Sequence, residues 1–154
     1  MAAPQVSVDL EDASGAPNVP APEQFQRWVE AAFAGRRDAA ELSIRVVDEQ
    51  EGATLNARYR GKHYATNVLS FPAELPAGVP LPMVGDLVIC APVVAREAAA
   101  QGKPLEAHWA HLTVHGCLHL IGFDHEDDRQ AQLMEPLETA ILAGLGFPDP
   151  YQAL

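Results

Sequence analysis

LEAHWAHLTVHGCLHLIGFDH, residues 105–125, is the segment of this 154-residue chain that most constrains its fold and its chemistry. We predict a long helix from Leu105 to Ile121. His115 and His119 are four residues apart, which on a helix places them about 40° apart around the axis and about 6 Å apart along it. Both imidazoles therefore project side by side and can bind one metal ion at about 2.0–2.1 Å.

A third histidine follows this helix. Gly122 can adopt the left-handed conformation that ends a helix, and the resulting turn can bring His125 to the same ion. Three neutral imidazoles leave a fourth tetrahedral position for water, which is typical of a catalytic zinc rather than a structural one. The segment therefore predicts one Zn²⁺ per chain, bound by His115, His119 and His125.

The other histidines are weaker candidates. His111 shares a helical stripe with His115 and His119, but residues eight apart on a straight helix are separated by about 12 Å, too far to share one ion. His111 is therefore expected to support the ligands, to contact the substrate, or to be a polar residue at the edge of a cleft. The sequence assigns no role to His63 or His108.

Outward from the histidines, predicted strands alternate with predicted helices. Strands are indicated by alternation and β-branched residues, and helices by proline near their starts, Asp48 as a cap and glycine past their ends. The strands are expected at 5–10, 42–47, 67–71 and 87–90, the helices at 22–34, 48–59, 92–101, 105–121 and 127–145, and loops at 14–22 and 74–85, the second bordering a cleft. This order predicts an α/β (α+β) fold, a single layered domain over residues 1–154.

Composition limits the functional class. Apolar residues make up 48% of the chain and charged residues 20%, as in a soluble globular protein. The chain contains no run of about 18 apolar residues, so no membrane span is predicted. The first residues lack the features of a signal peptide. Cys90 and Cys117 form no CxxC motif and are expected to be reduced thiols, which predicts a cytoplasmic protein.

Charge argues against a nonspecific nucleic-acid binder, because the formal net charge is −11. Three of the ten Lys and Arg residues, however, fall within five positions, as Arg58, Arg60 and Lys62. This basic cluster lies at the end of a predicted helix, where cations also complement the helix dipole. A polyanion is therefore expected to bind only at a local site.

The spacing of the three histidines is that of the metzincin proteases, whose motif has a glutamate directly after the first histidine. Gly116 occupies that position and cannot accept a proton, so ordinary zinc proteolysis is disfavoured. A phosphodiester instead requires stabilisation of negative charge on phosphoryl oxygens, for which a metal and a planar arginine are suited.

Five segments together resemble the YbeY family of bacterial zinc-dependent endoribonucleases, which act in ribosomal RNA maturation. They are Leu55-Asn-Ala-Arg-Tyr-Arg60, Thr66-Asn-Val-Leu-Ser-Phe-Pro72, Gly85-Asp-Leu-Val-Ile-Cys90, the segment from His115 to His125, and Asp149-Pro-Tyr151. The similarity runs in order from about Ser43 to Tyr151, and residues 1–40 match only loosely.

The resemblance implies a mixed four-stranded sheet and a metal site like that of the metzincins. It assigns the metal to His115, His119 and His125, and a catalytic role to Arg60. It also implies single-stranded RNA as substrate, 16S 3′ end maturation and ribosome quality control as the process, and the ribosome or ribosomal proteins as partners. Zinc-bound hydroxide and the ribose 2′-hydroxyl both remain open as the nucleophile.

Two alternatives of other classes remain. One is a metzincin-like peptidase with an atypical base, His111 or Asp86. The other is a non-catalytic zinc module that docks on the ribosome. Around His125, Asp124 is expected to hold a ligating imidazole or to be solvated, and the acidic residues 126–128 are expected to form a solvated helix start. Met134 is expected to pack in the core.

Overall fold

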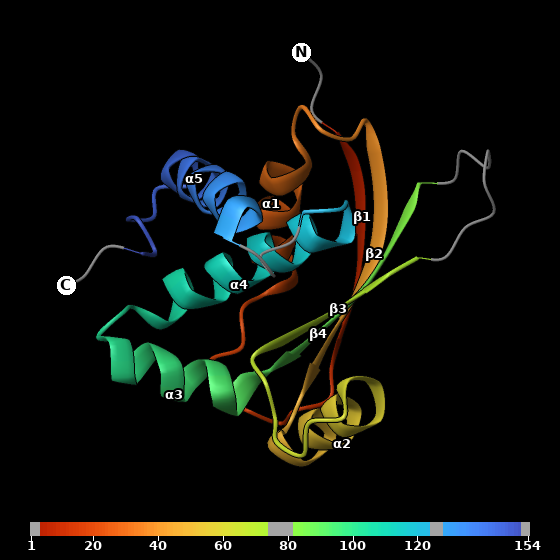
Figure 1. Ribbon diagram of the computed structural model, residues 1–154, viewed down its shortest axis with the longest axis vertical. Helices are drawn as coiled ribbons and strands as arrows, with labels where there is room; N and C mark the ends of the chain where they lie inside the picture. The colour runs from red at the N-terminus through yellow and green to blue at the C-terminus, as the bar shows by residue number, and fades with distance from the viewer. Residues whose placement is uncertain (1–3, 74–81, 124–127, 152–154) are drawn as a thin grey trace.

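The structure is a computed structural model, and it describes residues 4–73, 82–123 and 128–151. Four strands form one sheet in the order β1-β2-β4-β3; helices α1 to α4 contact the sheet, and α5 packs on α4 and α1 (Figure 1). In chain order the elements are β1 (Gln5–Asp12), α1 (Pro22–Phe33), β2 (Ala39–Val47), α2 (Glu49–Arg60), β3 (Val68–Pro72), β4 (Met83–Cys90), α3 (Ala91–Gln101), α4 (Leu105–Leu120) and α5 (Asp128–Gly144). The predicted α/β class and mixed four-stranded sheet are confirmed.

The sheet is mixed because its last strand runs against the others. β1 pairs with β2 and β2 pairs with β4 in parallel, whereas β3 pairs with β4 antiparallel. β2 and β4 are the two inner strands, and most of their residues are buried. β3 is an edge strand, which explains why it tolerates Pro72 as its last residue.

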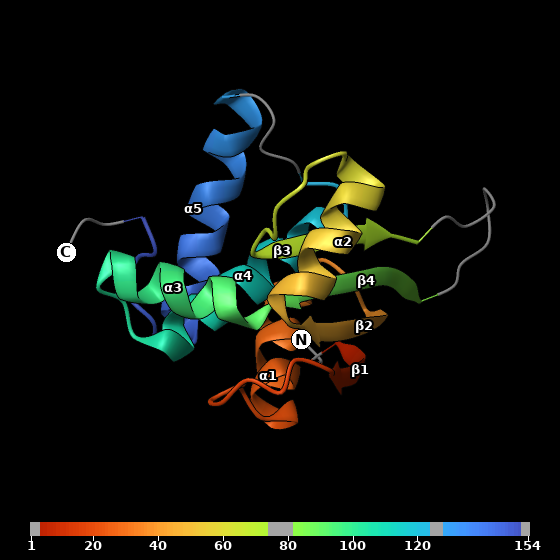
Figure 2. The same ribbon diagram turned by 90° about the horizontal axis from the view of Figure 1, so that it is seen from below.

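Helix α4 runs through the middle of the helical layer. It contacts β3 and β4 of the sheet, and α1, α3 and α5 pack around it (Figure 2). Leu87 and Ile89 of β4 belong to the large core on this side of the sheet. Alternation sends Val88 and Cys90 to the other face, where they form a small second cluster beside α2.

The boundaries of α2 follow from local signals. The Asp48 side chain accepts a hydrogen bond from the Glu51 backbone N–H, which caps the first turn. Gly61 ends the helix at φ 70°. The helix therefore finishes at Arg60, with Arg58 and Arg60 in its last turn, where they complement the dipole as predicted.

The end of α4 also confirms a sequence prediction. Gly122 has φ 106°, and the backbone N–H groups of Gly122 and Phe123 donate to the carbonyls of His119 and Leu118. This is a Schellman ending, which reverses the chain just after the second histidine. His125 and the acidic residues Asp124 and Glu126 lie outside the described residues.

The prediction of a loop over 74–85 is wrong for its last three residues, because β4 begins at Met83. Residues 74–81 lie outside the described residues. Gly85, which indicates a loop when it is considered alone, lies inside the strand at φ 142°, and a Cβ there would be 2.3 Å from the Phe71 carbonyl oxygen. Close pairing with β3, rather than a turn, requires this glycine.

Met134 and the two cysteines lie inside the protein. Met134 is buried in the core, and Cys90 and Cys117 are buried free thiols. Among the helices of the described residues, none is both long enough and apolar enough to cross a membrane.

Candidate active site

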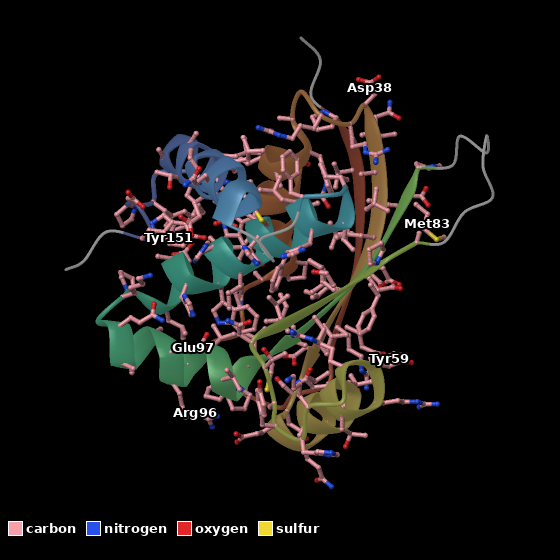
Figure 3. The ribbon with its side chains drawn as sticks, viewed as in Figure 1. Asp38, Tyr59, Met83, Arg96, Glu97 and Tyr151 are labelled. Atoms are coloured by element: carbon pink, nitrogen blue, oxygen red, sulfur yellow. The ribbon has the colours of Figure 1, made fainter. Side chains whose placement is uncertain are left out.

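A cleft of about 840 Å³ lies between the edge strand β3 and helix α4. Residues 66–72 form one wall, and His111, His115 and His119 line it from α4. The end of α2 contributes Tyr59 and Arg60, and Tyr151 lines it from beyond α5. Tyr59 and Tyr151 lie well apart in Figure 3, so the cleft collects residues from distant parts of the fold.

The two histidines predicted as ligands are neighbours in this cleft. The ring centroids of His115 and His119 are 4.7 Å apart, and the ring planes are inclined by 69°. Both side chains are partly exposed, as residues must be that face an open cleft. The structure thus brings together two of the three predicted ligands, and the position of the third, His125, lies outside the described residues.

Glu138 of α5 connects His115 to the protein interior. Its side chain is fully buried, and it accepts hydrogen bonds from His115 Nδ1–H and from the Tyr151 hydroxyl. His111 Nε2 lies 3.2 Å from the second carboxylate oxygen of Glu138 and 3.3 Å from the Tyr151 hydroxyl. Burial alone would raise the pKa of Glu138, but the hydrogen bonds from His111, His115 and Tyr151 outweigh burial and lower this pKa to about 2.

This network can hold a metal ion. One ligand atom each from His111, His115 and Glu138 lies within 4.8 Å of the other two. Imidazole nitrogens and carboxylate oxygens are the donors that Zn²⁺ takes beside thiolate. The donor chemistry of the described residues therefore fits a zinc site at this end of the cleft.

Neither Glu138 nor a role for Tyr151 was predicted from the sequence. Tyr151 belongs to one of the family motifs, but the motif alone predicts no function for it. Glu138 carried a detectable signal, because it falls between Met134 and Leu142 at a spacing of four, on the buried face of α5. A glutamate within an apolar helix stripe is uncommon unless it is paired, and this one is paired with the histidines of α4.

Arg60 shares the cleft with the histidines. Arg45 and Arg96 both form ion pairs with glutamates, whereas Arg60 has no ion-pair partner among the described residues. Its position in the last turn of α2 is fixed by the Gly61 cap. An unpaired guanidinium at the wall of a cleft is suited to bind an anionic group.

Gly116 has a structural reason to be glycine. Helix α4 lies so close to the sheet that a Cβ at this position would be 2.8 Å from Leu87 Cδ2 and 3.4 Å from Ser70 Oγ. Any side chain here requires Leu87 to move. Close packing of α4 on the sheet therefore leaves no room for a glutamate at the position where the metzincins have one.

The remaining candidates lie away from the ligands. His108 is buried, and its Nε2 lies 3.0 Å from Glu97 Oε1. Glu97 also accepts from the Asn67 amide at the cleft wall, so His108 helps to hold the start of β3. Asp86 accepts a hydrogen bond from the Ser43 hydroxyl and does not line the described cleft. His63 is exposed and does not line the cleft either.

Comparison with known proteins is consistent with this geometry. The family described as endoribonuclease YbeY matches residues 11–146. Proteins named endoribonuclease YbeY from Xanthomonas axonopodis pv. citri and Stenotrophomonas maltophilia are each 65% identical over 137 residues, which is 86% of this chain and 85% of theirs. The solution structure of TM1509 from Thermotoga maritima has the same fold, with a TM-score of 0.59 and 20% identity over 96% of this chain and 99% of that one. This chain therefore belongs to the endoribonuclease YbeY family.

Proposed function

We propose that this protein is a cytoplasmic zinc-dependent endoribonuclease that cleaves single-stranded RNA during ribosomal RNA processing. Within that process we assign it to maturation of the 16S 3′ end and to ribosome quality control, with the ribosome or its proteins as partners. The names of its relatives support the endoribonuclease activity. The observation that carries the proposal is that Arg60 lines the same cleft as His115 and His119.

In the proposed site, His115, His119 and His125 bind one Zn²⁺. Glu138 accepts a hydrogen bond from His115 Nδ1–H, which leaves Nε2 as the nitrogen that would bind the metal and fixes the orientation of the ring. The same interaction accounts for the short distances among His111, His115 and Glu138, since hydrogen-bonded atoms are close without sharing an ion. Bound zinc supplies a Lewis acid and lowers the pKa of water.

Arg60 contributes the charge that the transition state requires. Its guanidinium binds the phosphoryl oxygens of an RNA phosphate in the cleft and stabilises the negative charge that develops there. The acidic chain as a whole repels RNA, so binding depends on this local cation and its neighbours Arg58 and Lys62.

The peptidase alternative has less support. A base beside the first histidine would need a side chain at Gly116, which Leu87 opposes. Asp86 does not line the described cleft, so His111 is the remaining base among the two that the alternative named. His111 already interacts with Glu138 and Tyr151.

Metal analysis of single variants tests the ligand set. We expect His115→Ala, His119→Ala and His125→Ala each to lose about one zinc, and His111→Ala to retain most of it. Chelators should also remove zinc, and so should a pH of about 5, because protonated imidazoles cannot bind the metal. Loss of zinc in His111→Ala with retention in His119→Ala would instead assign the ion to the group of His111, His115 and Glu138.

Cleavage of a single-stranded RNA at matched zinc loading tests Arg60. Arg60→Ala should reduce turnover by roughly 10²-fold or more, as expected for the loss of a group that stabilises transition-state charge. Arg60→Lys should recover only part of the activity, because an ammonium lacks the bidentate fork. Arg58→Ala is the matched control from the same helical turn. Equal losses in Arg58→Ala and Arg60→Ala would reduce the cluster to general electrostatics, and an inactive wild type would favour the non-catalytic zinc module.

A further inference from the structure

We infer that Tyr59 is a stacking platform for one unpaired nucleobase of the RNA, next to the phosphate that Arg60 binds. The inference rests on the proposed function, because it takes single-stranded RNA as the ligand. It adds a binding contact that acts on the base rather than on the phosphate. Tyr59 and Arg60 are consecutive residues, and both line the cleft.

Exposure singles out this tyrosine. The large apolar side chains most exposed in the described part of the chain are Tyr59, Tyr64, Met83, Leu133 and Tyr151. Of these, only Tyr59 and Tyr151 line the cleft. The Tyr151 hydroxyl donates a hydrogen bond to the buried Glu138, so this tyrosine already has a partner in the protein. Tyr59 is 59% exposed at the wall of the cleft.

The ring of Tyr59 is held in place without a ligand. It packs against Phe71 of β3 with ring centroids 5.0 Å apart and an interplanar angle of 66°. Arg58 Cζ lies 5.9 Å from the ring centroid, at the outer range of a cation–π contact. Two elements thus fix the ring, so a base that stacks on it does not have to order a mobile side chain.

The surroundings favour a nucleotide over an apolar peptide. Arg58, Arg60 and Lys62 place the basic cluster of an otherwise acidic chain next to this ring. A nucleotide offers a flat base and a phosphate within one residue, which matches an aromatic side chain adjacent to an unpaired arginine. Aromatic stacking accepts every base, because each has a π-face, but it requires a base that is not already stacked in a duplex. Tyr59 therefore favours single strands without specifying a sequence.

Zinc-loaded full-length protein and a 2′-O-methyl oligonucleotide test the contact by fluorescence anisotropy. Tyr59→Ala should weaken binding about tenfold, within the range measured for base–aromatic stacking. Tyr59→Phe should bind like the wild type, and Tyr59→Leu, which keeps apolar bulk, should bind like Tyr59→Ala. Tyr64→Ala is the matched control, because Tyr64 is 61% exposed and does not line the described cleft. Equal zinc content and melting temperature establish that the variants are folded.

A series of oligonucleotides with one abasic ribose at successive positions identifies the stacked base. At one position, removing the base should cost the wild type about tenfold and cost Tyr59→Ala nothing further, which is the signature of direct coupling. Additive losses at every position, or wild-type affinity in Tyr59→Ala and Tyr59→Leu, would overturn the inference. Cleavage of ordinary RNA separates the two proposals. A wild type that cleaves while Tyr59→Ala binds normally refutes only the stacking, and a wild type that shows the coupling without cleaving refutes only the nuclease.

Discussion

Replacing Glu138 by glutamine tests whether this buried carboxylate orients His115 or binds the metal itself. Glutamine keeps the size of the side chain but removes its charge. A pKa of about 2, against an ordinary value of about 4.3 for glutamate, corresponds to about 3 kcal/mol of favourable interactions with the ionised form. We expect Glu138→Gln to lower the free energy of unfolding of the metal-free protein by about 2–3 kcal/mol at neutral pH, because the amide retains some hydrogen bonds.

The pH dependence gives this prediction a definite sign. The folded-state pKa of Glu138 is depressed, so its contribution is fully present above the unfolded pKa and is lost as the pH falls toward about 2. The difference in unfolding free energy between wild type and Glu138→Gln should therefore narrow on acidification, by about 1 kcal/mol at pH 3.5. Urea unfolding of the chelator-treated proteins at a series of pH values measures this difference.

Zinc affinity then separates the two roles of Glu138. An orienting carboxylate is worth about 10- to 100-fold in metal affinity, whereas removal of a direct ligand should abolish stoichiometric binding. Competition with a chromophoric chelator measures the affinity. Glu135→Gln is the matched control, because Glu135 lies three residues earlier on the same helix and is exposed, so this variant should bind zinc like the wild type. Zinc affinity in Glu138→Gln within twofold of the wild type would refute the proposed support of His115.

Three further predictions concern packing, protonation and salt. Gly116→Ala should destabilise the protein by about 1–3 kcal/mol in urea unfolding, because its Cβ would press on Leu87, whereas Gly144→Ala, with nothing within 4 Å, should not. Burial lowers the pKa of His108, although the hydrogen bond to Glu97 opposes this shift. Below about pH 6.5 the histidine is therefore protonated more readily in the unfolded chain than in the folded protein, so the free energy of unfolding falls on acidification. His108→Gln should flatten that fall, and an unchanged slope would contradict it. The logarithm of RNA affinity should fall with the logarithm of salt concentration at a slope that corresponds to about two or three phosphate contacts. A slope that corresponds to about eight or more contacts would indicate an extended basic surface.

Local signals explain the parts of the fold that the sequence predicted well. The Asp48 cap, the left-handed Gly61 and the turn at Gly122 act within a few residues of themselves, so their consequences can be inferred from adjacent residues. The same holds for the spacing of His115 and His119, whose proximity the helix enforces. The family and its mixed sheet, predicted from motifs, are confirmed.

Partners distant in sequence explain what the sequence did not predict. Glycine and proline predict a loop at the start of β4, because these local signals do not reveal that β2 and β3 pair with it. Glu138 and His115 are 23 residues apart on different helices, and their contact exists only once α5 packs on α4. The close approach of Leu87 to Gly116 likewise depends on tertiary packing.

The hydrogen bond between Glu138 and His115 also couples metal binding to the docking of α5. Whatever factor the docked helix adds to zinc affinity, bound zinc must add to the docking of the helix. Amide protons of α5 should therefore exchange more slowly in the zinc-loaded protein than in the metal-free one, even though the ligands lie elsewhere in the chain. The helix that completes this side of the cleft should therefore be held less firmly when zinc is scarce.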